Sequence, residues 1–409
     1  MDEKFRIEYG VLEEYLGNDN EVIIPDGVSF IKEYAFKDNK VITSITLPDS
    51  LEEIGEGAFY GCSSLKHINI PSQVKIIPDR AFYECTNLEE VEFNEELEEI
   101  GALAFASCTS LKGLSFSNNL VKIGASAFNK CSNLKSIRFG KNPKLIEIGK
   151  LAFNECKLLT VLELPLSLRL IDRNAFYGCS SLKKVDFHNG AGSNAFDIPG
   201  FLDIKDAAFG KCEKLETFVF GYKIKRVGNI FPDTTGLKKV SFGFSEVEII
   251  DDHAFASQRL LDEVVLPDTL KVIGPHAFSM CKNLSIVKLP EGLERIESYA
   301  FYNCHKLIAI DLNRNLKYLG PQAFDTCSSL RDVDIPDEIS SIGSHTFSMC
   351  DRLEKVSLSD NTRDIHPLAF LGCKNIKEIT YRGNKEEWDK LELDKVFSTS
   401  KDYKVIFEK

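Results

Sequence analysis

The sequence predicts a repeat solenoid of about fifteen stacked turns, each close to 23 residues long. Three observations support this fold class. An Ala-Phe pair recurs at a fixed interval, apolar residues keep a constant distance from that pair, and the cysteines all fall at one position of the repeat. A chain of 409 residues exceeds the usual size of a single globular core. A repeat array avoids that limit because each turn packs only on its neighbours.

The Ala-Phe pair sets the period. Thr346-Phe347 replaces it once, and Ile230-Phe231 marks a shortened copy. The copies begin at Ala35, Ala58, Ala81, Ala104, Ala127, Ala152, Ala175, Ala208, Ala254, Ala277, Ala300, Ala323 and Ala369. Self-similarity at this interval is typical of a solenoid.

Each repeat predicts two short strands. Leu65 to Ile70 alternates apolar and polar residues, as expected for a strand with one face in the core. Pro71 follows and ends strand pairing. A second extended piece, such as Val74 to Ile77, precedes a tight helical or irregular turn that holds the Ala-Phe pair. Stacked turns bury Leu, Ile and Phe in continuous ladders.

The twelve cysteines lie four residues after the anchoring Ala or Thr of their repeats. We expect them to point inward, where a small side chain packs and hydrogen-bonds a neighbouring backbone group. Disulfides between adjacent turns are a weaker alternative, since parallel inward side chains suit the required dihedral angle poorly. Zinc sites use close cysteine pairs, whereas these cysteines are at least 23 residues apart, so we expect no metal and no other cofactor. The set is Cys62, Cys85, Cys108, Cys131, Cys156, Cys179, Cys212, Cys281, Cys304, Cys327, Cys350 and Cys373.

The segment Leu51 to Cys62, LEEIGEGAFYGC, resembles the BspA-like leucine-rich repeat, also called the Treponema pallidum type. The resemblance extends over roughly residues 22–380. It implies a leucine-rich repeat right-handed superhelix, strand-rich with short helical or irregular turns and capped at both ends. Members are mostly bacterial surface or secreted proteins, and several are thought to adhere to host proteins or other cells. The resemblance therefore implies a binding or adhesion role.

We expect three regions along the chain. Residues 1–21 form an N-terminal cap hairpin, and residues 22–380 form the array, with an insertion near 188–197. Residues 381–409 form a C-terminal cap with a short helix from Lys385 to Leu393 that lays Trp388 on the last turn. Such caps cover the core and strand edge that a terminal repeat exposes.

Charge and hydropathy restrict the partners. A net charge of -12 argues against nucleic acid and favours a basic or neutral protein, with a glycan as an alternative. Apolar runs are too short to cross a bilayer, so we expect no membrane insertion. The start of the chain shows no secretory signal. This predicts a cytoplasmic protein if Met1 is native, and a surface or secreted protein if a leader was trimmed.

The sequence favours a binding module that is not an enzyme, because it has no nucleophile motif, phosphate-binding glycine loop or HExxH. The alternative is a scaffold that self-associates, although we expect a monomer. His253 and His276 share one repeat position, and residues 88–99 are acidic; solvated surface is the simpler interpretation of both. An outward apolar stripe is an interaction site if it is contiguous. Its members are Val161, Val219, Val265, Ile286 and Ile308.

The best candidate binding region is residues 183–245. It contains the Gly- and Asn-rich insertion and the shortened repeat, and irregular segments on a rigid scaffold often carry recognition. A loop insertion without function is the equally weighted alternative. The candidate binding residues are Lys183, Lys184, His188, Asn189, Phe196, Thr217, Val219, Tyr222, Lys238, Lys239 and Phe244.

Overall fold

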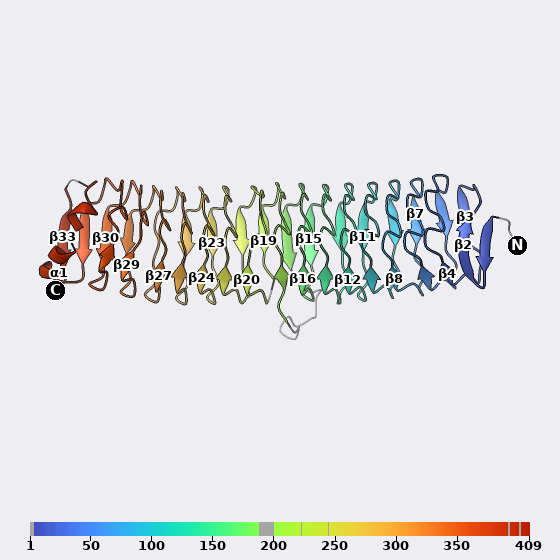
Figure 1. The fold of residues 1–409 in the computed structure, drawn as a ribbon, viewed down its shortest axis with the longest axis horizontal. Helices are drawn as coiled ribbons and strands as arrows, with labels where there is room; N and C mark the ends of the chain where they lie inside the picture. Colours follow the sequence, from blue (N-terminus) through green and yellow to red (C-terminus); the bar gives the residue numbers. More distant parts are fainter. Residues whose placement is uncertain (1–3, 188–199, 222, 244, 392, 401) are drawn as a thin grey trace. The chain divides into compact units, whose positions relative to one another are not determined.

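The computed structural model describes residues 4–187, 200–221, 223–243, 245–391, 393–400 and 402–409. The chain divides into two compact units, Met1–Leu215 with Ile230–Thr234, and Glu216–Asn229 with Thr235–Lys409. Within each unit, successive turns place their strands in two rows (Figure 1). The predicted repeat solenoid is confirmed in each unit.

The first unit has one row of longer and one row of two-residue strands. The longer strands are β3 (Glu21–Ile23), β5 (Ser44–Thr46), β7 (His67–Asn69), β9 (Glu90–Glu92), β11 (Gly113–Ser115), β13 (Ser136–Arg138), β15 (Val161–Leu164) and β17 (Lys184–Phe187). The two-residue strands are β4 (Phe30–Ile31), β6 (Glu53–Ile54), β8 (Ile76–Ile77), β10 (Glu99–Ile100), β12 (Lys122–Ile123), β14 (Glu147–Ile148), β16 (Leu170–Ile171) and β18 (Asp203–Ile204). Pairing is parallel and in register: Ile77, Ile100 and Ile123 are successive partners.

The second unit repeats this plan. Its longer strands are β19 (Thr217–Val219), β21 (Lys239–Ser241), β23 (Glu263–Val265), β25 (Ile286–Lys288), β28 (Asp332–Asp334), β30 (Lys355–Leu358), β32 (Glu378–Tyr381) and β33 (Lys404–Phe407). Its two-residue strands are β20 (Arg226–Val227), β22 (Ile249–Ile250), β24 (Val272–Ile273), β26 (Arg295–Ile296), β27 (Tyr318–Leu319), β29 (Ser341–Ile342) and β31 (Asp364–Ile365).

The anchoring phenylalanines form the centre of the core in both units. The rings of Phe59, Phe82 and Phe105 stack at 5.0 Å with interplanar angles of 6°. In the second unit, Phe278 and Phe301 stack in the same way at 5.3 Å. All five rings are almost completely buried. Because burial of an aromatic side chain stabilises a fold strongly, this ladder supplies much of the cohesion between turns.

Two residues with positive φ flank the Ala-Phe pair in most turns, which makes the turn tight. In one turn these are Arg80 (φ 57°) and Glu84 (φ 60°). This conformation costs a non-glycine residue about 1 kcal/mol. Their N–H groups donate to the carbonyls of Ala102 and Ala106 in the next turn, each at 2.9 Å. The hydrogen bonds between turns offset the local strain, so the turn needs no glycine.

The cysteines pack beside the phenylalanine ladder as predicted. Each thiol donates to the carbonyl of the Phe in the preceding turn, as from Cys85 to Phe59 at 3.2 Å and from Cys304 to Phe278 at 3.2 Å. All twelve are buried and free, so the disulfide alternative is wrong for this structure. Burial raises the pKa of Cys281 to about 12, which keeps that thiol protonated and unreactive at neutral pH.

The ends of the chain differ from the repeats. β1 (Phe5–Glu8) and β2 (Val11–Tyr15) form an antiparallel hairpin, and β2 pairs in parallel with β4. The short helix predicted near the C-terminus is confirmed as α1 (Lys385–Lys390), followed by a 3₁₀ turn, η2 (Leu393–Lys395). Trp388 on α1 is buried, and β33 extends the sheet beside β32. Within the described ranges, no helix is long and apolar enough to span a membrane.

Candidate binding site

The row of longer strands in the second unit is interrupted at one turn. Residues 308–312 lie between β25 and β28 and form no strand, although the two-residue row continues through β26 and β27. The carbonyl of Ile308 accepts the N–H of Arg331 at 3.1 Å. Among the described residues, no backbone N–H of residues 309–312 donates to a backbone carbonyl. The regular ladder is therefore open at this place on the outer face.

A groove of about 1150 Å³ lies over this interruption. Its lining includes Ala309, which is exposed and occupies the position that Ile286 and Asp332 hold in the adjacent turns. Ile286 and Ile308 form apolar walls and are 60% and 50% exposed. The small Ala side chain beside two larger aliphatic ones accounts for the hollow. Such a concave, partly apolar surface is the usual form of a binding site.

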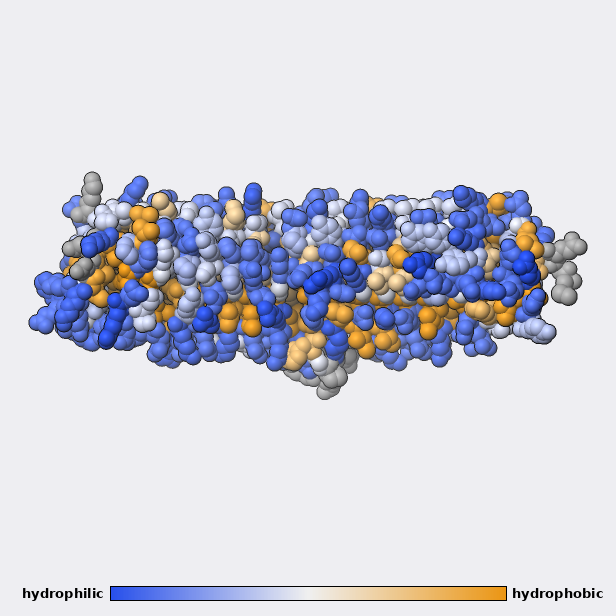
Figure 2. Space-filling view, in the orientation of Figure 1, coloured by the Kyte–Doolittle hydropathy of each residue, from blue (hydrophilic) through white to orange (hydrophobic). Residues whose placement is uncertain are grey.

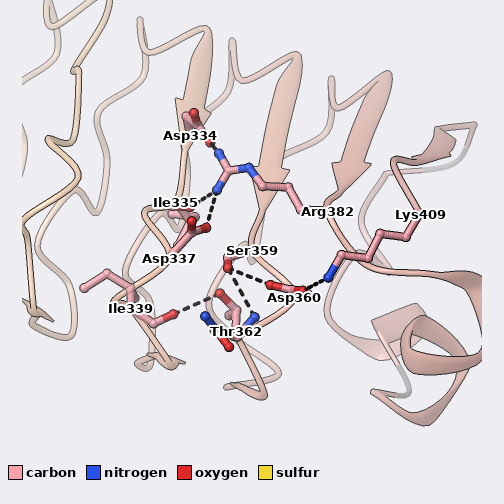
Figure 3. Close-up of polar contacts among 10 residues, drawn as sticks. Asp334, Ile335, Asp337, Ile339, Ser359, Asp360, Thr362, Arg382 and Lys409 are labelled. Atoms are coloured by element: carbon pink, nitrogen blue, oxygen red, sulfur yellow. Dashed lines mark hydrogen bonds and ion pairs between the residues drawn. The ribbon is translucent and has the colours of Figure 1, made fainter.

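Charged side chains surround the groove. Arg382, at the end of β32, reaches back to the turn after β28 (Figure 3). Its guanidinium donates to the carbonyl of Ile335 at 3.1 Å, to the carboxylate of Asp337 at 2.9 Å, and to the carboxylate of Asp334. The other charged residues of the rim are Asp268, Lys288, Glu291, Asp311 and Arg314.

The charges of the rim differ from those on the rest of the array in their pairing. Elsewhere, oppositely charged side chains of adjacent turns pair repeatedly. Examples are Lys75–Glu98 at 3.4 Å, Lys122–Glu99 at 3.1 Å, Lys225–Glu248 at 3.5 Å and Lys317–Glu294 at 3.1 Å. The side chains of Lys288, Asp311 and Arg314 make no hydrogen bond or ion pair within the part of the chain that the structure describes. These three groups are therefore available to a partner.

The predicted stripe and the predicted binding region have different outcomes. Val161 in the first unit and Val265, Ile286 and Ile308 in the second are exposed as predicted, whereas Val219 is half-buried. Of these, Ile286 and Ile308 share the groove. Figure 2 shows one face of the molecule, which is mostly hydrophilic with hydrophobic side chains gathered in patches.

Region 183–245 is only partly described. Lys183 and Lys184 are exposed in the first unit, and Lys184 pairs with Asp186 at 2.9 Å. In the second unit, Thr217 lies opposite Lys239, and Lys238 pairs with Glu216 at 3.3 Å. The remaining candidates, His188, Asn189, Phe196, Tyr222 and Phe244, lie outside the described residues. This region stays a prediction.

The other two sequence features have structural explanations. Acidic residues of segment 88–99 pair with lysines of adjacent turns, among them Glu89 with Lys112. His253 and His276 stack with ring centroids 4.6 Å apart and 19° between their planes. Burial and the neighbouring His253 lower the pKa of His276. Over the described ranges, no three His, Cys, Asp or Glu side chains gather in an arrangement that suits a metal ion.

The comparisons with known proteins concern the repeat. A family model described as the BspA type leucine rich repeat region matches residues 14–117, 99–198, 133–262, 187–304 and 248–377. These overlapping segments extend over most of the chain. No curated protein matches.

One solved structure supports the fold, and two others are similar in sequence over most of their length. A leucine-rich repeat protein from Bacteroides ovatus is 24% identical over 99% of this chain and 97% of its own, with a TM-score of 0.55. A leucine-rich cell surface protein from Faecalibacterium prausnitzii is 22% identical over 95% and 96%, with a TM-score of 0.41. The pneumococcal vaccine antigen PcpA is 22% identical over 98% and 92%, with a TM-score of 0.43. At 24% identity, the similarity to the Bacteroides ovatus protein indicates a shared fold and nothing about function.

Proposed function

We propose that this chain, which belongs to the BspA-type leucine-rich repeat family, is a non-catalytic binding module whose second unit recognises a protein partner in the groove at Ala309. The family membership supports a repeat scaffold, and the groove supports a particular place on it. Adhesion to a host protein or to another cell is the setting that the family resemblance suggests for such a module.

The observation that carries this proposal is the combination of exposed apolar walls with unpaired charges. Ile286 and Ile308 together offer aliphatic surface that a partner can bury. Lys288, Asp311 and Arg314 stand beside them without partners in the described chain. An interface needs both, because apolar burial supplies affinity and placed charges supply specificity and orientation.

The scaffold around the groove favours binding with little reorganisation. β23 and β25 are in register on one side, where Val264 pairs with Val287, and β28 and β30 are in register on the other. Buried residues such as Val287 and Val333 hold the flanking strands in the core. Side chains on a rigid element lose less freedom on binding, so more of the interaction energy appears as affinity.

The test is retention of a partner by matched variants. Purified chain is used to capture proteins from cell lysate and from extracellular matrix extracts, with identification by mass spectrometry. Ala309→Trp places a bulky side chain in the groove. Ser136→Trp makes a similar increase in side-chain volume at the same repeat position of the first unit, where Ser136 is also exposed. We expect Ala309→Trp to lose at least 90% of the captured partner (about tenfold, ~1.4 kcal/mol) and Ser136→Trp to keep it.

Equal retention by both variants would contradict the location of the site. Loss by both would point to general damage, which unfolding curves on the same samples would reveal. Mass measurement over a range of concentrations tests the alternative scaffold role. A constant monomer mass supports the binding module, and a mass that rises with concentration supports self-association.

A further inference from the structure

We propose that the groove is a receptor for an arginine side chain presented by a peptide segment of the partner, with the guanidinium at Asp311 and the aliphatic stem between Ile286 and Ile308. This inference rests on the proposed binding function and specifies the chemistry of the partner. The observations that carry it are an internal arginine on the same rim, the charge of the groove, and its apolar walls.

Arg382 shows how this rim binds a guanidinium. The carboxylates of Asp334 and Asp337 and the carbonyl of Ile335 accept from one guanidinium, whose side chain remains only 26% exposed. The planar group with several donors suits this arrangement of acceptors better than an ammonium does. Asp311 holds the position of Asp334 one turn earlier and has no ion pair in the described chain.

The charge of the groove favours a cation. Its lining has five carboxylates and three cationic side chains, a net charge of -2, and Arg382 already neutralises two of the carboxylates. The whole chain carries a net charge of -12, so its field adds to the attraction. Lys288 and Arg314 on the same rim offset part of this attraction, and the carboxylates remain in excess.

The walls favour a side chain that is apolar along its length and charged at its tip. Ile286 and Ile308 are exposed on the wall, and Asp311 stands on the rim of the same hollow. The three methylene groups of arginine bury against aliphatic surface while the guanidinium stays at a polar edge. One arginine therefore satisfies both features of the groove, whereas a purely aliphatic side chain leaves Asp311 without a partner.

The experiment selects linear twelve-residue peptides from a displayed random library on the full chain, with counter-selection on Ala309→Trp. We expect arginine to be enriched next to aliphatic residues. The best peptide is then synthesised with arginine and with citrulline, its neutral isostere, and titrated by fluorescence anisotropy. Binding should weaken about tenfold or more on citrulline replacement and on Asp311→Asn.

Asp332→Asn is the matched control because it removes the same charge from the same face, one turn away and outside the groove. It should change the dissociation constant less than threefold. Enrichment of peptides without arginine, or equal affinity for the citrulline peptide, would overturn the arginine assignment and leave the groove as a binding site. Failure to enrich any peptide over Ala309→Trp would overturn both proposals.

Discussion

Phe278 and Ile286 belong to the same turn of the second unit, but their surroundings differ completely. Phe278 is fully buried between Phe255 and Phe301, both at 5.3 Å, whereas Ile286 is 60% exposed. The position of Phe278 carries the same residue in almost every repeat, while that of Ile286 carries Glu263 and Ala309 in the adjacent turns. Stacking requires the first position to repeat, whereas the second is free to vary. The binding site that we propose lies where the repeat is interrupted.

The largest expected effect is a loss in the free energy of unfolding at alkaline pH, caused by the buried thiols. Burial raises the pKa of Cys62, Cys179, Cys281 and Cys327 to about 12 from an ordinary value near 9. Because the pKa is higher in the folded chain than in the unfolded chain, thiol ionisation leaves the stability of the fold intact below pH 9. As the pH rises from 9 toward 12, the unfolded chain loses these protons first, so the fold loses stability. Each pH unit in that window removes about 1.4 kcal/mol per thiol, so the free energy of unfolding should fall by on the order of 10 kcal/mol by pH 11.

Urea unfolding followed by circular dichroism between pH 8 and pH 11 measures this loss. Cys281→Ser removes one titrating thiol while retaining a hydrogen-bond donor, so its slope should be smaller by about 1.4 kcal/mol per pH unit. An unchanged slope would mean that this thiol is not shielded in the core.

Truncation of a ladder ring should have the next largest effect. Phe278→Ala leaves a cavity between Phe255 and Phe301, and we expect the free energy of unfolding to fall by about 3 to 5 kcal/mol. Phe278→Leu keeps more of the volume and should cost clearly less. If urea unfolding gave the same stability for both variants and the parent chain, the ring would lie outside the core.

Removal of a single thiol should lower the free energy of unfolding by less than truncation of a ladder ring. Cys304→Ala loses the hydrogen bond to the Phe278 carbonyl and leaves a small void, which together should cost about 1 to 2 kcal/mol. Cys304→Ser keeps a donor at this site and should lose less. Thermal unfolding of the two variants side by side tests the order, and a less stable Ser variant would show that packing outweighs the hydrogen bond.

The smallest effect on stability should come from the groove itself. Ile286→Ser changes an exposed side chain that no neighbouring strand buries, so the free energy of unfolding should stay within about 0.5 kcal/mol of the parent. The same variant should weaken partner binding. A loss of stability near that of Phe278→Ala would mean that Ile286 is a structural residue, and the contrast between the two positions would disappear.

The sequence was sufficient to predict the interior because one arrangement is enforced in every turn. The interval between Ala-Phe pairs predicted the stacking, and the fixed offset of Cys304 from its anchor predicted a thiol packed against a neighbouring backbone group. Exposure of Ile286 and Ile308 also followed from their places between the apolar positions of the repeat. These are properties of a periodic pattern.

The groove could not be predicted in the same way. It depends on the missing strand at residues 308–312 and on a hydrogen bond network in which Arg382 reaches residues 45 to 48 positions earlier. A weak signal existed, because aligned repeats place the small Ala309 between Ile286 and Asp332 and place Asp311 next to Asp334. Because of the loop insertion, the sequence pointed to region 183–245 instead, where five of the eleven named residues are not described.

Site-specific photocross-linking tests the central claim most directly. A benzophenone amino acid is placed at position 308 in the groove and, in a second protein, at position 136 of the first unit, which is the repeat position of Ala309. Both proteins are irradiated with the captured partner. Ile308 and Ser136 are both exposed, so each probe is accessible. The account predicts a covalent adduct from position 308 that free arginine-containing peptide suppresses, and none from position 136. Adducts from position 136 alone, or equally from both, would contradict it.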